Sequence, residues 1–404
     1  MRAPFLMCLS RGSALGRLPG FEPLRRTPPV GGDGGVMLQA WAELLRVSAL
    51  FTVPGDALAG AATLGTRPNR GTALAVGASL CLYEAGMALN DWADREEDAV
   101  DRPHRPIPSG RITPAAALTA AGALTAAGLA LASRAGRPAL AVATALSATV
   151  WSYDLHFKHT PGGPAAMAAA RGLDLVLGAV ATGTSPGRGS LGRGPLREPA
   201  GGAGVRGAAL VALPSAAVLA AHTYAVTTVS RREAQGGSTI APLAALAATL
   251  GLGVLAARER RAVGRPGVGQ SPQGLPGTPA RAPGAPAPST APTPAPAPTP
   301  APSTAPAPAP APAPAPPPAR SPALALTPAR LLAATYIRTA ATPLLHAALN
   351  PSPPLTQRAV GGGIRAMIPL QAALAARAGA DATALAVMGL VPLARKLARK
   401  VSPT

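Results

Sequence analysis

The 404-residue chain contains few cysteines and few aromatic residues. Its two cysteines, Cys8 and Cys81, lie far apart and belong to no Cys-x-x-Cys or Cys/His pattern, which argues against a disulfide framework and a zinc site. The formal net charge is +20, but aromatic residues make up only 3% of the chain and the arginines are scattered among loops. A net positive charge that is not gathered in one basic patch, without a nucleic-acid recognition motif, does not indicate nucleic-acid binding, so no nucleic-acid partner is expected.

Charge is also scarce. Charged residues make up 13% of the chain against 48% hydrophobic residues, and the mean hydropathy is +0.24. The apolar residues recur in blocks of roughly 17–25, the length that crosses a bilayer, and they lack the period-two alternation of barrel strands. Because unpaired backbone groups are costly in hydrocarbon, helices are the expected spanning structure. We therefore expect an all-α, multi-pass transmembrane helical bundle in the cell membrane, with membrane lipids around it.

Nine apolar spans are predicted to form helices. The last of them is long enough to be broken at Gly379. Both sets of loops carry arginine, so the positive-inside rule does not decide the orientation of the bundle. The expected spans are 43–64, 72–89, 113–133, 137–153, 164–182, 206–226, 239–257, 328–349 and 365–398.

The composition divides the chain into four segments. The first, rich in arginine, proline and glycine, is either a disordered extension or the product of an over-long gene start, with translation beginning at Met37. The third consists largely of Pro-Ala repeats, which have almost nothing to bury and are expected to form a disordered linker. The segments are 1–36, the first part of the membrane core at 37–263, the linker at 264–322, and the last part of the core at 323–404.

An acid-rich segment follows the second apolar span and holds a large share of the chain's few acids. On a helix, Asn90, Asp94 and Asp98 are four residues apart and Asp91 lies three residues before Asp94, so their oxygens can share one face. Hard oxygen ligands at this spacing suit Mg²⁺, which commonly completes its octahedron with water and substrate phosphates. These four residues are the predicted metal ligands, with the three aspartates in the catalytic role.

Two arginines lie just downstream. Arg102 and Arg105 offer donors that match phosphate oxygens. The alternative is a solvated charged loop between two membrane spans. The acids directly adjoin apolar helix ends, however, and a proline-rich segment after them imposes a tight path, which favours a functional site.

The whole segment, NDWADREEDAVDRPHRPIPSGRIT, resembles the first aspartate-rich motif of the UbiA-type prenyltransferases, NDxxDxxxD followed by RPxRPIPSG. The resemblance runs from about Leu44 to Arg399 outside the insertions and is strongest at this motif. It implies nine transmembrane helices around a central cavity, with Mg²⁺ and an isoprenyl diphosphate at its polar end. The implied activity is transfer of the prenyl group to an aromatic or other lipophilic acceptor.

The segment WSYDLHFKH at the end of the fourth span resembles the tyrosine-to-lysine segment of the family. The resemblance assigns Lys158 to the diphosphate, and Tyr153 is a further candidate contact to substrate. Without the resemblance, a lysine at a helix end could equally complement the helix dipole. Arg171 and Asp174, three residues apart inside the fifth span, could form either a structural ion pair or a contact to the cavity.

The family's second motif, usually DxxxD before Gly-x-x-Thr, is altered between the sixth and seventh spans. Gly236 and Thr239 keep the ending, but Glu233 is the only acid. Arg231 and Arg232 occupy the region and are expected to bind the diphosphate directly, with Glu233 as a candidate metal ligand. This departure puts a second magnesium held by protein ligands in doubt.

Two further expectations follow from the sequence. His222 and the other histidines have no HExxH or paired spacing and are predicted not to bind metal. A transporter or lipid-binding protein of the same fold, without chemistry, is the alternative function, because a fold alone does not determine function. A soluble terpene cyclase would also use aspartate-rich helices, but the repeated long apolar spans argue against solubility.

Overall fold

The protein is described by a computed structural model, which covers residues 33–184, 203–233, 236–258 and 326–392. These ranges are helical almost throughout and contain no strand. The predicted linker at 264–322 and most of the N-terminal extension lie outside them. The helices are α1 (Asp33–Leu44), η1 (Val47–Thr52), α2 (Val53–Ala62), α3 (Arg70–Ala93), α4 (Arg95–Asp101), α5 (Pro114–Ala135), α6 (Arg137–Ser152), η2 (Tyr153–Phe157), α7 (Gly163–Thr184), α8 (Ala203–Ser230), α9 (Ile240–Ala257), α10 (Pro328–Leu349), α11 (Pro353–Arg377) and α12 (Asp381–Met388).

The predicted all-helical bundle is confirmed, with differences at its two ends. The first expected span is not one helix, because Arg46 adopts a left-handed conformation with φ 48° and separates α1 from η1 and α2. The last span breaks at Gly379 as expected, where φ is +79°, a value that glycine tolerates without strain. α1 begins at Asp33, inside the segment that was expected to precede the core.

Local sequence explains several helix boundaries. Asn69 and Thr72 form a reciprocal capping box at the start of α3. Thr113 accepts a hydrogen bond from the Ala116 amide at the start of α5, and a proline occupies the first turn, where its missing amide hydrogen costs nothing. These caps set where α3 and α5 begin, and the acid-rich segment lies between the two helices.

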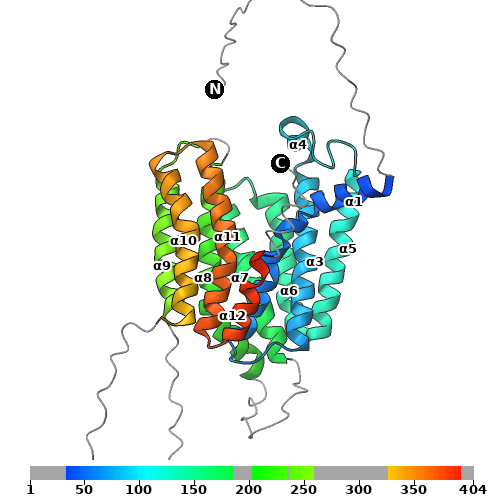
Figure 1. The fold of residues 1–404 in the computed structure, drawn as a ribbon. Coiled ribbons are helices and arrows are strands. Elements are labelled where there is room, and N and C mark those ends of the chain that lie inside the picture. The colour runs from blue at the N-terminus through cyan, green and yellow to red at the C-terminus, as the bar shows by residue number, and fades with distance from the viewer. Residues whose placement is uncertain (1–32, 185–202, 234–235, 259–325, 393–404) are drawn as a thin grey trace, which may run out of the picture.

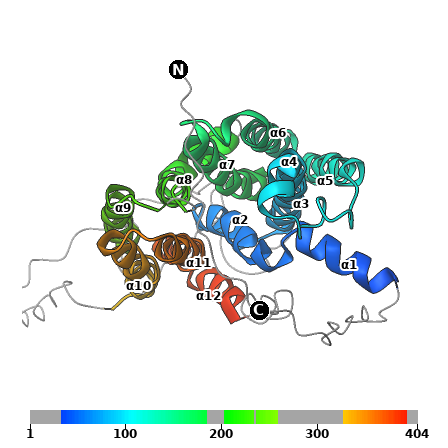
Figure 2. The same cartoon turned by 90° about the horizontal axis from the view of Figure 1, so that it is seen from above.

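The helices stand roughly side by side, with the short helix α4 at one end of the bundle (Figure 1). Seen from above, α2 lies between α7 and α11, and it contacts both (Figure 2). The contact with α7 is very close: a methyl group on Gly60 would overlap the Leu175 carbonyl oxygen, and one on Gly178 would overlap the Ala57 backbone. Glycines at these positions therefore let two backbones touch inside the bundle.

We expect Gly60→Ala to destabilise the bundle by about 1–3 kcal/mol, because the added methyl group forces α2 away from α7. Thermal unfolding of the detergent-solubilised protein, followed by circular dichroism, measures the change. Gly251→Ala is the matched control, since a methyl group on Gly251 of α9 meets no atom within 4 Å. An equal unfolding temperature for both variants would contradict the close contact.

A buried polar network also joins α2, α7 and α11. Arg171 Nε lies 3.0 Å from Asp56 Oδ2, and Gln371 Nε2 donates to Asp56 Oδ1 at 2.6 Å. Asp174, by contrast, accepts a hydrogen bond from Ser79. Of the two alternatives for Arg171, an ion pair is present, but its partner is Asp56 of another helix rather than Asp174. The network therefore ties the helices before the insertion to α11 after it.

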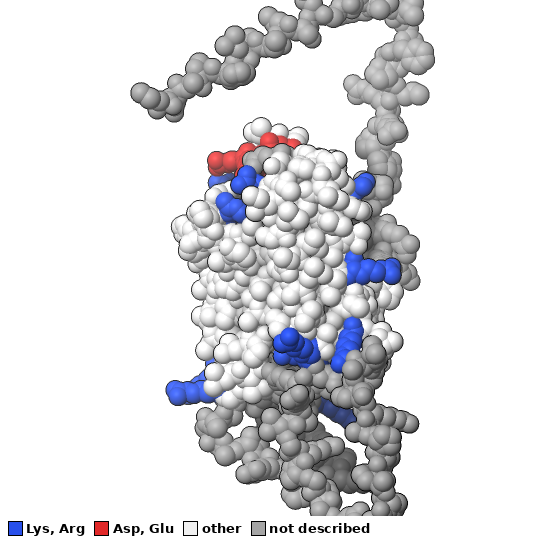
Figure 3. Space-filling view, turned by 90° about the vertical axis from the view of Figure 1, so that its left-hand side faces the viewer, with Lys and Arg blue, Asp and Glu red and all other residues white. Residues whose placement is uncertain are grey.

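Six helices in the described ranges are long and apolar enough to cross a membrane. Between the charged ends, the face in Figure 3 is largely uncharged, and its acidic side chains gather at one end. Exposed large apolar side chains on α8, α9 and α10 suit contact with lipid: Leu210, Leu213, Ile240, Leu243, Leu250, Val254 and Leu331. The protein is thus a multi-pass membrane protein.

Two apolar hollows have volumes of about 510 and 440 Å³. The first is lined by residues of α8 and α9, including Ala221 and Ala248, and the second by residues from α6 to α7, including Ser152 and Phe157. Neither is lined by the acid-rich segment. The central cavity implied by the resemblance therefore stays a prediction.

Candidate functional site

The acid-rich segment does not form one helix. α3 ends at Ala93, and α4 begins at Arg95, so Asp94 stands where two helices meet. The Asp98 amide donates to the Asp94 carbonyl at 2.8 Å, which keeps the start of α4 in register with Asp94. The four predicted ligands therefore do not lie on one unbroken helix, because the chain turns at Asp94. Their shared role as metal ligands stays a prediction.

Two of the carboxylates are held by arginines. Asp91 and Asp98 are both buried, with side chains 6% and 3% exposed. Arg105 bridges them: its Nη1 lies 3.3 Å from Asp91 Oδ1 and 2.6 Å from Asp98 Oδ2. Arg102 Nη1 approaches Asp98 Oδ1 at 3.3 Å. The carboxylates thus position the arginines that were predicted to bind phosphate. Charge-assisted bonds reach Asp91 Oδ1 and both Asp98 oxygens, which were predicted to bind metal.

A third arginine reaches the same place and was missed by the sequence reasoning. Arg46 Nη2 lies 3.0 Å from Asp91 Oδ1, the oxygen that Arg105 also contacts. Its left-handed backbone is the one positive φ of a non-glycine residue in the described ranges, and such strain concentrates at functional positions. The signal in the sequence was an arginine inside an expected apolar span. Two guanidinium groups converge on one carboxylate oxygen.

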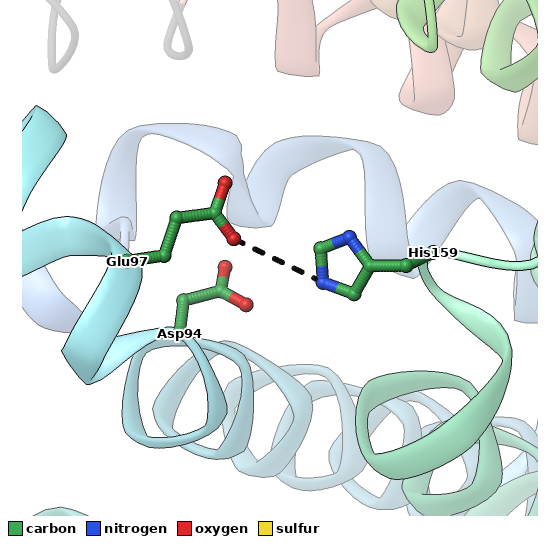
Figure 4. Close-up of side chains that lie close together, drawn as sticks. All are labelled: Asp94, Glu97 and His159. Atoms are coloured by element: carbon green, nitrogen blue, oxygen red, sulfur yellow. Dashed lines mark ion pairs between the residues drawn. The ribbon is translucent and has the colours of Figure 1, made fainter. Parts of the chain in front are cut away.

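Asp94 has a different set of neighbours. Lys158 Nζ forms an ion pair with Asp94 Oδ2, as expected if the lysine works beside the motif. Glu97 and His159 offer further ligand atoms, and one atom from each of these two residues and Asp94 lie within 4.8 Å of one another. Figure 4 shows the three side chains pointing toward a common region from two segments of the chain. Glu97 and His159 were not predicted as ligands.

A π-helix turn delivers Lys158 and His159 to this region. α6 ends at Ser152, and the turn η2 follows, in which the Lys158 amide donates to the Tyr153 carbonyl at 2.9 Å. Such five-residue turns are rare and are frequent at functional sites. The wider turn changes the direction in which the following side chains point, and no spacing rule applied to the sequence predicted it.

Asn90 is held by a residue that the sequence reasoning did not single out. Its amide nitrogen donates to Asp154 Oδ1 at 3.0 Å, which leaves the Asn90 amide oxygen as an acceptor. Burial raises the pKa of Asp154 to about 6, and the bond from Asn90 opposes this shift.

The altered second motif lies beside the same loops. Arg231 donates to the Thr160 carbonyl, one residue after His159, while Arg232 is exposed. Glu233 is half-buried; burial raises its pKa, and the charge of Arg102 opposes that rise. The segment after α8 is therefore near the first motif, as the resemblance implied. Binding of diphosphate by Arg231 and Arg232, and of metal by Glu233, stays a prediction.

Comparison with known proteins agrees with these features. Residues 48–257, about half of the chain, match the sequence model of the UbiA prenyltransferase family. The digeranylgeranylglyceryl phosphate synthase of Methanopyrus kandleri is 37% identical over 129 residues, which are 31% of this chain and 46% of that one. The protein of the same name from Halobacterium salinarum is 34% identical over 154 residues, 38% of this chain and 54% of that one. The chain thus spans about half the length of these relatives.

Similar solved structures are more distant. A structure of digeranylgeranylglyceryl phosphate synthase has 13% identity and a TM-score of 0.46, and it covers 85% of this chain and 98% of that one. A UbiA homolog from Archaeoglobus fulgidus, solved with GPP and Mg²⁺, has 18% identity and a TM-score of 0.41, and it covers 54% of this chain and 76% of that one. The family expected from the acid-rich motif is confirmed by the sequence match. The chain belongs to the UbiA prenyltransferase family.

Proposed function

We propose that this membrane protein transfers a prenyl group from an isoprenyl diphosphate to an aromatic or other lipophilic acceptor. The observation that carries the proposal is the gathering of Lys158, Arg105 and Arg46 around the carboxylates where α3 ends. Family membership supports it, as does the shared name of relatives that are digeranylgeranylglyceryl phosphate synthases. The cell membrane is the proposed location.

The basic side chains would bind the diphosphate. Guanidinium groups match phosphate oxygens through paired hydrogen bonds, and Lys158 adds a compact charge. Asp91 and Asp98 keep the arginines directed toward one place before substrate arrives, so little reorganisation is needed when charge develops on the leaving group. In the transfer, the bond from C1 of the prenyl group to the diphosphate oxygen breaks, and its electron pair leaves with the diphosphate. An electron pair of the acceptor then forms the new bond to C1, and the attacking acceptor atom loses its proton to water.

The residues present fit a magnesium ion. Asn90 has its amide nitrogen engaged by Asp154, so its oxygen is available, and Asp94 is a half-buried carboxylate next to it in the same helix end. These two oxygen donors would hold Mg²⁺, and the substrate phosphates and water would complete its preferred six ligands. The ion, when bound, supplies positive charge that stabilises the departing diphosphate. Asp91 and Asp98 would contribute indirectly, because they position the arginines beside the ion.

Release of diphosphate from a radiolabelled isoprenyl diphosphate is the direct test. The full chain, purified in detergent and supplied with an extract of membrane lipids as acceptors, should release diphosphate with Mg²⁺ and stop when EDTA is added. Mass spectrometry of the lipids identifies the prenylated acceptor. Substrate binding without any release at saturating Mg²⁺ would favour a lipid-binding or transport protein of the same fold.

A further inference from the structure

Asp94, Glu97 and His159 form a group of three possible metal ligands of mixed chemistry. Asp94 caps the end of α3, Glu97 belongs to α4, and His159 follows the π-helix turn η2, so two separate segments supply the donors. The ligand atoms all lie within 4.8 Å of one another, and Glu97 Oε2 is 4.0 Å from His159 Nε2. Figure 4 shows their arrangement around a shared space.

The neighbouring carboxylates differ from these three in their partners. Asp91 and Asp98 are committed to arginines, as described above. Glu97 and His159, with side chains 61% and 70% exposed, have water available on their other sides. Within the described ranges, Glu97 and His159 make no polar side-chain contact other than the one with each other. Two exposed side chains from separate segments therefore approach each other beside a third possible ligand.

We propose that Asp94, Glu97 and His159 hold a second divalent cation, of the transition-metal class represented by Mn²⁺. Donors on an ion at roughly 2.1 Å lie about 3 Å apart when adjacent and about 4.2 Å apart when opposite, so small side-chain movements bring these three onto one ion. Lys158 occupies one oxygen of Asp94, and the Mg²⁺ proposed above would take another position, but a carboxylate offers about four lone-pair positions and can serve all three partners.

The imidazole sets the choice of metal. A site made of oxygen alone suits Mg²⁺ and Mn²⁺ alike, whereas an imidazole nitrogen suits transition metals, whose affinity rises from Mn²⁺ towards Cu²⁺; Mn²⁺ serves here as a paramagnetic member of that class. The Mg²⁺ proposed for Asn90 and Asp94 has oxygen donors only, so the two sites differ in preference. The histidine sequence pattern predicted no metal ligand, because His159 meets its partners through the turn of the chain and not through spacing along a helix.

The location accounts for the altered second motif. The segment after α8 carries Arg231, which contacts the Thr160 carbonyl beside His159. A guanidinium group in this segment cannot ligate a cation, but Glu97 and His159 lie on the neighbouring segments that it touches. Carboxylate and imidazole ligands supplied by α4 and the loop after η2 thus replace the aspartates absent after α8. This role as a second ion beside the diphosphate rests on the proposed function; the Mn²⁺ site itself does not.

Mn²⁺ binding without substrate is the test. The full chain in detergent, with any histidine tag removed, is titrated with Mn²⁺ while electron paramagnetic resonance follows the free ion. We expect bound Mn²⁺ that a tenfold excess of Mg²⁺ does not displace, with an echo modulation from a coupled imidazole nitrogen. His159→Gln should abolish the modulation and weaken binding by about tenfold to hundredfold, and Glu97→Gln should weaken it similarly.

The neighbouring residues provide matched controls. His156→Gln and Glu96→Gln change the same residue types in the same segments, but His156 is exposed outside the group and Glu96 pairs with Arg95. Both controls should bind Mn²⁺ as the unaltered protein does. Absence of nitrogen coupling in the unaltered protein overturns the inference, whatever happens to the variants. Mn²⁺ bound through His159 without any diphosphate release would instead refute the proposed function and leave this site standing.

Discussion

Asp94→Asn should lower the rate of diphosphate release by at least about a thousandfold while the protein stays in the membrane. Asp94 is the one carboxylate of the motif that meets Lys158, and it stands between the donors of both proposed cation sites. Asparagine keeps the size of the side chain but removes its charge, so attraction for a cation and for Lys158 is lost together. Removal of one preorganised group costs up to about a thousandfold, and this residue serves several.

The measurement is single-turnover release of labelled diphosphate at several Mg²⁺ concentrations. Asp101→Asn is the matched control, because Asp101 is an exposed acid at the end of α4. It should retain the rate of the unaltered protein. If Asp94→Asn kept its turnover and its apparent affinity for Mg²⁺, the end of α3 would not be the metal site.

Arg105→Ala should cost about 1–3 kcal/mol in the free energy of unfolding and remove most activity. Arg105 is the bridge between two buried carboxylates, and deleting it leaves Asp98 Oδ2, a buried charged acceptor, without its partner. Arg46 and Arg102 remain, but each reaches only one of the two carboxylates. We expect Asp91 and Asp98 to move apart and the connection between α4 and α5 to change its conformation.

Unfolding in detergent, followed by circular dichroism, gives the stability change, and labelled diphosphate release gives the activity. Arg105→Lys should recover only part of both, because one ammonium group lacks the planar fork that spans two carboxylates. Arg95→Ala is the control: Arg95 pairs with Glu96, whose side chain is 86% exposed, and contacts Trp92, but it reaches no buried carboxylate, so its loss should cost less. Equal effects of Arg95→Ala and Arg105→Ala would refute the bridging role.

The fold class was accessible from the sequence because bilayer thickness and backbone hydrogen bonding leave few solutions. Apolar blocks of about twenty residues must be helices in hydrocarbon, and the break at Gly379 was visible because glycine tolerates a positive φ. The left-handed turn at Arg46 was not visible, since arginine has no local preference for that conformation. Its side chain pairs with Asp91 across 45 residues of sequence, a contact that no local pattern encodes.

The candidate site shows the same division. The acid-rich segment and Lys158 were recognisable because residue types and spacing along one segment carry their chemistry. Which carboxylates pair with arginine was decided only by tertiary structure. The turn at Asp94, the wide turn before Lys158 and the approach of His159 to Glu97 bring separate segments together. Sequence determined the groups available at the end of the bundle, and packing determined their partners, because distances between segments depend on how helices meet rather than on spacing within any one of them.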